Sequence, residues 1–134
     1  MMKSKNNTMI NENEIQKFWS ENPMIHRDIK KKFNKETASP EEIFDFIEKM
    51  HRRSAIHNNS GEPLLSKFIN YKNLKGKVIL EIGFGTGWLI SEFQKVAKKV
   101  CGIELSKSSL KLSKYRFRNC DNVNLQIASA EDIP

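Results

Sequence analysis

Gly83, Gly85 and Gly87 lie within five residues, directly after the aliphatic run VILEI at residues 78–82. Glycine loses more backbone freedom on folding than any other residue, so it is costly inside a helix or a strand. The aliphatic run is typical of a buried parallel strand. A strand, a glycine-rich turn and a following helix bring the backbone close to a ligand, because no side chain intervenes. The segment predicts a binding loop for an anionic group, either a phosphate or a carboxylate.

The residues after this loop repeat the strand–helix pattern. Apolar residues from Leu89 to Ala97 have helical spacing, and residues 100–104 and 123–128 read as two further strands. Ser106 is placed to cap a helix that carries Leu110, Tyr115 and Phe117. Alternating strands and helices predict an α/β fold with a parallel sheet that helices cover on both faces.

The first half of the chain predicts helices instead. Residues 12–21 form a short amphipathic pattern, and residues 39–53 begin with a capping box and a proline at the first helical position. A further helix is expected from Pro63 to Ile69. The predicted organisation is a disordered tail (1–11), a helical N-terminal segment on the cap or substrate side (12–75) and an α/β domain (76–134).

Two familiar phosphate-binding patterns do not match the glycine loop. The dinucleotide pattern GxGxxG would require glycine at Trp88, and the P-loop pattern would require lysine after Gly87. Glu104 ends the second predicted strand, where a carboxylate can accept hydrogen bonds from two ribose hydroxyls. The pattern therefore favours a nucleoside-containing ligand.

These residues resemble a known family. VILEIGFGTGWLI is similar to motif I of the class I S-adenosylmethionine-dependent methyltransferases, GIELS to their second-strand acidic motif, and IASAEDIP to the segment before their fourth strand. The resemblance implies a Rossmann-like parallel sheet with flanking helices, and S-adenosyl-L-methionine as cofactor. No metal ligand and no catalytic base is implied.

The family's cofactor-binding positions carry over to seven residues. Glycines 83, 85 and 87 would cradle the methionine moiety, and Glu81 would brace the loop and reach the amino group through water. Glu104 would bind the ribose. Ser129 and Ala130 align with positions that meet the adenine, although Ser129 replaces a frequent acidic residue and accepts the adenine amino group only weakly.

The N-terminal segment carries a weaker resemblance. FWSENP (18–23) and HRRSAI (51–56) are similar to one branch of small-molecule methyltransferases, which implies a small-molecule methyl acceptor. Family members have seven strands and this sequence reaches the third, so we expect a truncated chain. The alternative is a catalytically inactive remnant that binds cofactor weakly, or a pairing module. An open edge of the sheet would then favour a homo-oligomer or a completing chain.

Several other residues have two possible roles. Phe84 and Trp88 could lie near the sulfonium, but packing against the loop is the favoured interpretation. Trp19 could belong to the core or cover the cofactor. The three scattered histidines are weak candidates for a general base. Arg52 and Arg53 are expected to complement a helix dipole.

Composition limits the remaining classes. The formal net charge of +7 raises the possibility of an RNA-binding or RNA-methylating protein. Lysine outnumbers arginine, however, and the basic excess is shared by both halves of the chain, so nucleic acid is a less favoured partner. Cys101 and Cys120 lie in no metal-binding motif and are expected to be reduced thiols. The sequence shows neither a signal peptide nor a membrane-spanning run, so a cytoplasmic protein is predicted.

Overall fold

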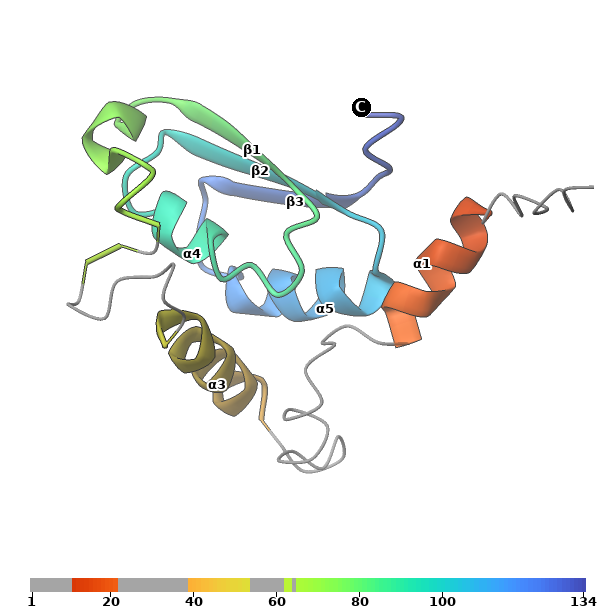
Figure 1. The fold of residues 1–134 in the computed structure, drawn as a ribbon. Helices are drawn as coiled ribbons and strands as arrows, with labels where there is room; N and C mark the ends of the chain where they lie inside the picture. Colours follow the sequence, from red (N-terminus) through yellow and green to blue (C-terminus); the bar gives the residue numbers. More distant parts are fainter. Residues whose placement is uncertain (1–10, 22–38, 54–61, 64) are drawn as a thin grey trace, which may run out of the picture.

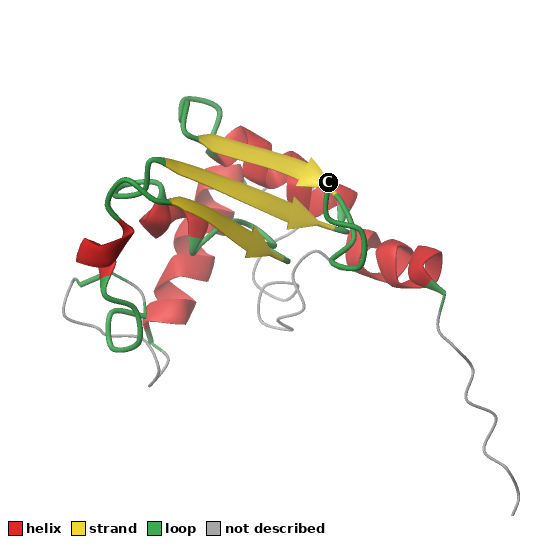
Figure 2. Ribbon diagram, turned by 90° about the horizontal axis from the view of Figure 1, so that it is seen from above, coloured by secondary structure: helices red, strands yellow, loops and turns green. Residues whose placement is uncertain are grey.

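The structure is a computed structural model that describes residues 11–21, 39–53, 62–63 and 65–134, and its sheet has three parallel strands. The strands are β1 (Val78–Ile82), β2 (Lys99–Glu104) and β3 (Val123–Ile127), in the order β1-β2-β3. Each lies within one residue of its predicted position. Because the strands are parallel, their carboxyl ends meet at one edge of the sheet (Figure 2).

The helices that follow β1 and β2 lie on the same face of the sheet. These are α4 (Ile90–Phe93) and α5 (Lys107–Arg116), and both lie below the strands in Figure 1. On the other face, the β1 side chains of Val78, Leu80 and Ile82 are exposed. The expectation of helices on both faces is therefore wrong for the described residues. Right-handed crossovers that advance in one direction, as the order β1-β2-β3 requires, place their helices on one face.

The core lies between the sheet and these helices. Val100 and Leu125 come from the sheet, Phe84 from the glycine loop, and Phe117 from the end of α5. Other members come from α4 and the turns after it: Ile90, Phe93 and Ala97. Most of the apolar residues whose spacing predicts a helix from Leu89 to Ala97 are thus in the core or packed against it. The assigned helix is shorter because Lys95 N–H bonds to Glu92 and Val96 N–H bonds to Phe93, which is the tighter i−3 pattern.

Two predicted helix starts are confirmed by their caps. In α3 (Pro40–Arg52), Glu42 N–H donates to Ser39 Oγ at 3.2 Å and Ser39 N–H donates back to Glu42 Oε2 at 2.9 Å, which completes the capping box. In α5, Ser109 N–H donates to Ser106 Oγ at 3.1 Å.

The helix predicted from Pro63 to Ile69 is wrong. Leu65 has φ 61°, a left-handed conformation that cannot continue a right-handed helix, and residues 65–68 form a turn. Phe68 is exposed, while Ile69 packs against the core. A short 3-10 helix, η1 (Tyr71–Leu74), follows and leads into β1.

The predicted helix at residues 12–21 is confirmed as α1 (Glu12–Glu21). Most of the predicted tail lies outside the described residues, as do Asn22-Pro23, His26 and His57. In the part of the chain that the structure describes, no helix is long and apolar enough to cross a membrane.

Gly102 tests how tightly the sheet packs on the glycine loop. A Cβ at this position would lie 2.6 Å from Phe84 Cδ1 and 2.8 Å from Leu125 Cδ2. We expect Gly102→Ala to lower the free energy of unfolding by about 2 kcal/mol, because both neighbours are buried. In a Leu125→Ala background the same change should cost less, since space is available. Urea denaturation of the four variants measures this, and a neutral Gly102→Ala would contradict the packing.

Candidate functional site

The glycine loop turns the chain away from β1 at the carboxyl edge of the sheet. Glycines 83, 85 and 87 have φ values of 72°, 54° and 72°. Residues that carry a side chain rarely adopt such positive φ values. A Cβ at Gly83 or Gly85 would meet no heavy atom within 4 Å, so open space lies beside the backbone there. A ligand can therefore approach the main chain at these two positions.

Gly87 has a different role. A Cβ there would lie 2.5 Å from Cε2 of Phe117, which packs behind the loop. The three glycines, all predicted to contact the ligand, thus differ in their surroundings. Gly83 and Gly85 lie beside open space, whereas Gly87 allows close packing against the end of α5.

Glu104 holds the loop from the adjacent strand. Its Oε2 accepts a hydrogen bond from Gly85 N–H at 2.8 Å, and its Oε1 accepts one from Ser106 N–H at 2.9 Å. The half-buried carboxylate therefore joins the glycine loop to the N-cap of α5. Each carboxylate oxygen has a second lone pair, so Glu104 can still accept hydrogen bonds from a ligand.

The three glycine amides are occupied within the protein. Besides Gly85, Gly83 N–H donates to Ile103 O at 2.8 Å and Gly87 N–H donates to Phe84 O at 2.8 Å. These three amides are therefore not available to the anionic group that the sequence predicts at this loop. The charged group facing the ligand space is the carboxylate of Glu104, which favours a neutral or cationic group beside it.

A cavity of about 340 Å³ opens beside Glu104. We call it the Glu104 pocket. Apolar and small side chains from four parts of the chain line it, together with the loop backbone: Trp19, Ile82, Gly83, Gly85, Ile103, Glu104, Leu105, Ser106, Ser109, Ala128 and Ala130. Its volume lies at the lower end of the range for small-molecule sites.

Four of the seven predicted cofactor residues line this pocket. These are Gly83, Gly85, Glu104 and Ala130. Ser129 lines a neighbouring, more open cavity with Asp132 and the side of α1. Gly87 and Glu81 are not among the lining residues.

Glu81 is an unpaired acid beneath the loop. Its Oε2 is buried and has no hydrogen-bond partner among the described residues. Burial raises the pKa of Glu81 to about 7, with a further contribution from the negative charge of Glu104. An orphaned carboxylate oxygen next to a ligand pocket is a place where a donor from a ligand or a water would be stabilised.

Helix α1 forms one wall of the pocket through Trp19. Ser106 Oγ donates to Trp19 O at 3.0 Å and Ser108 Oγ donates to Ser20 O at 2.7 Å. Two serines at the start of α5 thus hold the end of α1 through hydrogen bonds. Figure 1 shows the end of α1 beside the start of α5. Of the two roles considered for Trp19, the structure places it in the pocket wall and not in the core.

The other aromatic residues of the loop pack away from the pocket. Phe84 is fully buried in the core. Trp88 stacks on His51 of α3, with ring centroids 4.1 Å apart. The packing interpretation is correct for both, and His51 lies outside the pocket lining.

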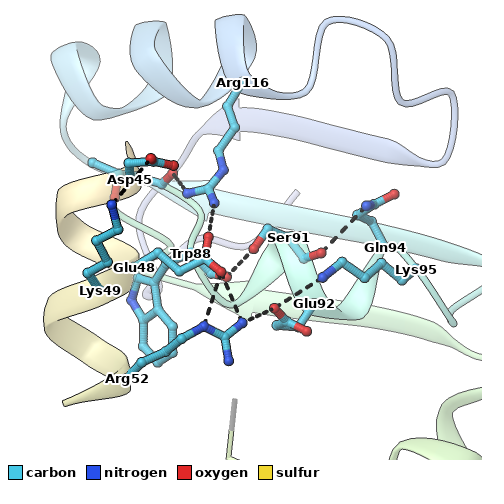
Figure 3. Close-up of polar contacts among 11 residues, drawn as sticks. Asp45, Glu48, Lys49, Arg52, Trp88, Ser91, Glu92, Gln94, Lys95 and Arg116 are labelled. Atoms are coloured by element: carbon cyan, nitrogen blue, oxygen red, sulfur yellow. Dashed lines mark hydrogen bonds and ion pairs between the residues drawn. The ribbon is translucent and has the colours of Figure 1, made fainter. Parts of the chain in front are cut away.

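Arg52 lies in the last turn of α3, where a positive charge complements the helix dipole as expected, and it also makes specific ion pairs. It contacts Glu48 at 2.9 Å and the buried Glu92 of α4 at 3.2 Å (Figure 3). Glu48 and Arg52 are four residues apart, but the contact from Arg52 to Glu92 joins distant segments and has no signal in local sequence. Among the described residues, no cluster of histidine, cysteine or acidic side chains could hold a metal ion, and Cys101 and Cys120 are free.

Comparison with known proteins finds a family match for the C-terminal part of the chain, from within β1 onward. Residues 79–134 match the family model of a methyltransferase domain. This segment is therefore similar to a methyltransferase domain. It contains β1, the glycine loop and Glu104, so the resemblance of these motifs is confirmed.

Structural similarity to solved proteins extends beyond this segment to most of the chain. The Haemonchus contortus phosphoethanolamine N-methyltransferase 1, in complex with phosphoethanolamine and S-adenosylhomocysteine, aligns with a TM-score of 0.58 and 16% identity, over 91% of this chain and 22% of that one. The [4+2]-cyclase SpnF aligns with a TM-score of 0.52 and 12% identity, over 92% of this chain and 45% of that one. At these identities the likeness shows a shared Rossmann-like fold.

The chain spans less than half the length of either structure. No curated protein sequence matches it significantly. The SpnF likeness also shows that this fold occurs in a protein whose described reaction is a cyclisation, so the fold alone does not define the reaction.

The raised pKa of Glu81 predicts a pH-dependent stability. The folded-state pKa of about 7 lies above the ordinary value of 4.5, so folding is more favourable when Glu81 is protonated. This contribution to the free energy of unfolding is fully present below about pH 4.5 and is lost as the pH rises through 7. By about pH 8 the loss amounts to about 3 kcal/mol. We expect Glu81→Gln to raise the free energy of unfolding at about pH 8 and to change it little near pH 4.5.

Urea denaturation across this pH range measures the difference. Glu131→Gln, at an exposed acid outside the pocket, is the control and should show no such crossover. Equal effects of Glu81→Gln at both pH values would contradict the buried, protonated carboxyl.

Proposed function

We propose that this chain binds S-adenosyl-L-methionine in the Glu104 pocket and serves methyl transfer to a small-molecule acceptor. The observation that carries the proposal is the carboxylate of Glu104, which contacts Gly85 N–H and also faces the pocket. A carboxylate at the end of the second strand can bind the ribose of a nucleoside cofactor. The open space beside the backbone of Gly83 and Gly85 can take the substituent attached to that ribose.

The charge of the site supports this cofactor over a dinucleotide. Among the described residues, no lysine or arginine lines the Glu104 pocket, whereas a pyrophosphate requires cations or free amides. A sulfonium and an ammonium group are positive. An ionised Glu104, and an ionised Glu81 behind it, would stabilise them.

The predicted site residues would contact different parts of the cofactor. Gly83 and Gly85 would let the methionine part approach the main chain, and Glu104 would accept hydrogen bonds from the ribose hydroxyls. Glu81 would accept from the amino group, through water. Ala130, with Ser129 at the pocket margin, would meet the adenine.

When bound, the cofactor supplies an electrophilic methyl group on a sulfonium, which is already a good leaving group. The contribution of the protein is then to orient the reactants and to exclude water. The apolar lining of the pocket and the indole of Trp19 are suited to this exclusion. No catalytic base is assigned.

The acceptor class rests on a separate argument. The Phe18-Trp19 stretch resembles one branch of small-molecule methyltransferases, and Trp19 lies in the pocket wall. This position would bring α1 to the side of the cofactor from which an acceptor approaches.

The cofactor proposal predicts the effect of removing Glu104. We expect the chain to bind S-adenosylhomocysteine saturably, and Glu104→Ala to weaken binding by about 30-fold or more, because charge-assisted hydrogen bonds are lost. Isothermal titration calorimetry measures the affinity, with the exposed acid of Glu131→Ala as the matched control and NADH as the comparison ligand. Binding of NADH without binding of S-adenosylhomocysteine would contradict the proposal.

Trp19 provides an independent optical readout. The chain has two tryptophans, so Trp88→Phe leaves Trp19 as the single indole. We expect S-adenosylhomocysteine to change the fluorescence of this variant saturably, since Trp19 faces the pocket. Trp19→Phe leaves Trp88, which stacks on His51 outside the pocket, and should show a much smaller change. Equal responses would place the ligand elsewhere.

A further inference from the structure

The back of the glycine loop is held by α5. Ser113 Oγ donates to Gly85 O at 2.9 Å, and Arg116 Nη1 donates to Thr86 O at 3.3 Å. Thr86 is buried, and Phe117 fills the space behind Gly87. The loop is thus fixed on the side opposite to the ligand.

Arg116 is the charged member of this set. Its side chain is 12% exposed, and its guanidinium lies 5.0 Å from the ring centroid of Phe44 in α3. Burial lowers the pKa of Arg116, while the carboxylates of Glu48, Glu92 and Asp45 raise it. A buried guanidinium is strongly stabilised by an anion placed against it.

Glu48 of α3 supplies that anion. Its Oε2 lies 3.6 Å from Arg116 Nη2, and its Oε1 accepts from Arg52 Nη2 at 2.9 Å. Arg52 in turn contacts Glu92 of α4, whose side chain is 5% exposed, at 3.2 Å. Figure 3 shows this chain of contacts running from α5 through α3 to α4.

Helix α3 also meets the loop directly. His51 stacks on Trp88, the residue after Gly87. No residue of α3, however, lines the Glu104 pocket in the described structure. Any effect of α3 on a ligand there must therefore pass through the loop backbone.

We propose that Arg116, held by Glu48 of α3, is a positioning residue that fixes the backbone of the glycine loop for the cofactor. The proposal rests on the proposed function for the identity of that cofactor. It makes the helical N-terminal segment part of the binding machinery, because docking of α3 and binding at the loop stabilise each other.

The test is the hydrogen exchange of the loop amides without ligand. In Glu48→Gln we expect Gly85 and Gly87 to exchange about tenfold faster than in the unmodified chain. The mostly buried Arg116 then loses the charge of its partly exposed partner, which loosens its hold on the loop. Val100 N–H, bonded to Asn122 O at 2.8 Å at the start of β2, is the internal reference for opening of the sheet. Its exchange should change much less.

Asp45→Asn is the matched control on the same helix. It makes the same charge change one turn away, at an exposed acid that pairs with Lys49 at 3.7 Å and has the smallest effect of the three acids on Arg116. Loop exchange should stay within about twofold of the unmodified chain. Arg116→Lys is the second variant, and it should speed loop exchange because lysine lacks the fork that reaches both Thr86 O and Glu48.

The affinity for S-adenosylhomocysteine is the second readout. We expect Glu48→Gln to weaken it by about three- to tenfold and Asp45→Asn to leave it unchanged. Equal acceleration of Gly85 and Val100, or no acceleration of Gly85, would overturn the positioning role. If loop exchange responds as expected and the unmodified chain does not bind this ligand, the positioning role stands and the proposed cofactor is wrong.

Discussion

The site depends on the hydrogen bonds that the Glu104 carboxylate accepts from two backbone amides. This carboxylate ties the Gly85 amide on one side and the Ser106 amide on the other, so one side chain fixes both the ligand loop and the start of α5. Parallel pairing makes this possible, because it brings the carboxyl ends of β1 and β2 to the same edge. The same side chain then faces the pocket with lone pairs to spare. Structural support and ligand recognition are therefore carried by one residue.

The surroundings of this carboxylate define what it can recognise. The glycine amides are already bonded within the protein, and Glu81 places a second acid beneath the loop with a buried oxygen unpaired. The carboxylate of Glu104 therefore supplies negative charge on the ligand side, in keeping with a cationic cofactor. Glu81, whose pKa burial raises to about 7, adds to this charge only when it is ionised. Positive charge lies behind the loop, where Arg116 contacts the Thr86 carbonyl and Glu48. The two sides of one short loop thus carry opposite charges with separate roles.

Much of this could be predicted from the sequence, and the failures have physical causes. The strands and the capped helices depend on local patterns, and each is found. Of the residues that the motifs single out, Gly83, Gly85, Glu104 and Ala130 line one pocket. The helix after Pro63 failed because Leu65 adopts a left-handed conformation, which residue spacing does not reveal. Helices on both sheet faces failed because strand order, and not local pattern, decides the face. The Glu48–Arg116 contact and the packing at Gly102 join distant segments, so neither has a signal in local sequence.

An NMR titration with S-adenosylhomocysteine tests the central claim most directly. The amide protons of Gly85 and Ser106 both bond to the Glu104 carboxylate, and Gly83 lines the same pocket. We expect these three amide resonances to shift saturably and together, while the resonance of Gly76, exposed in the turn before β1, stays in place. A folded chain in which the resonances of Gly83, Gly85 and Ser106 remain unmoved at saturating ligand would contradict the claim.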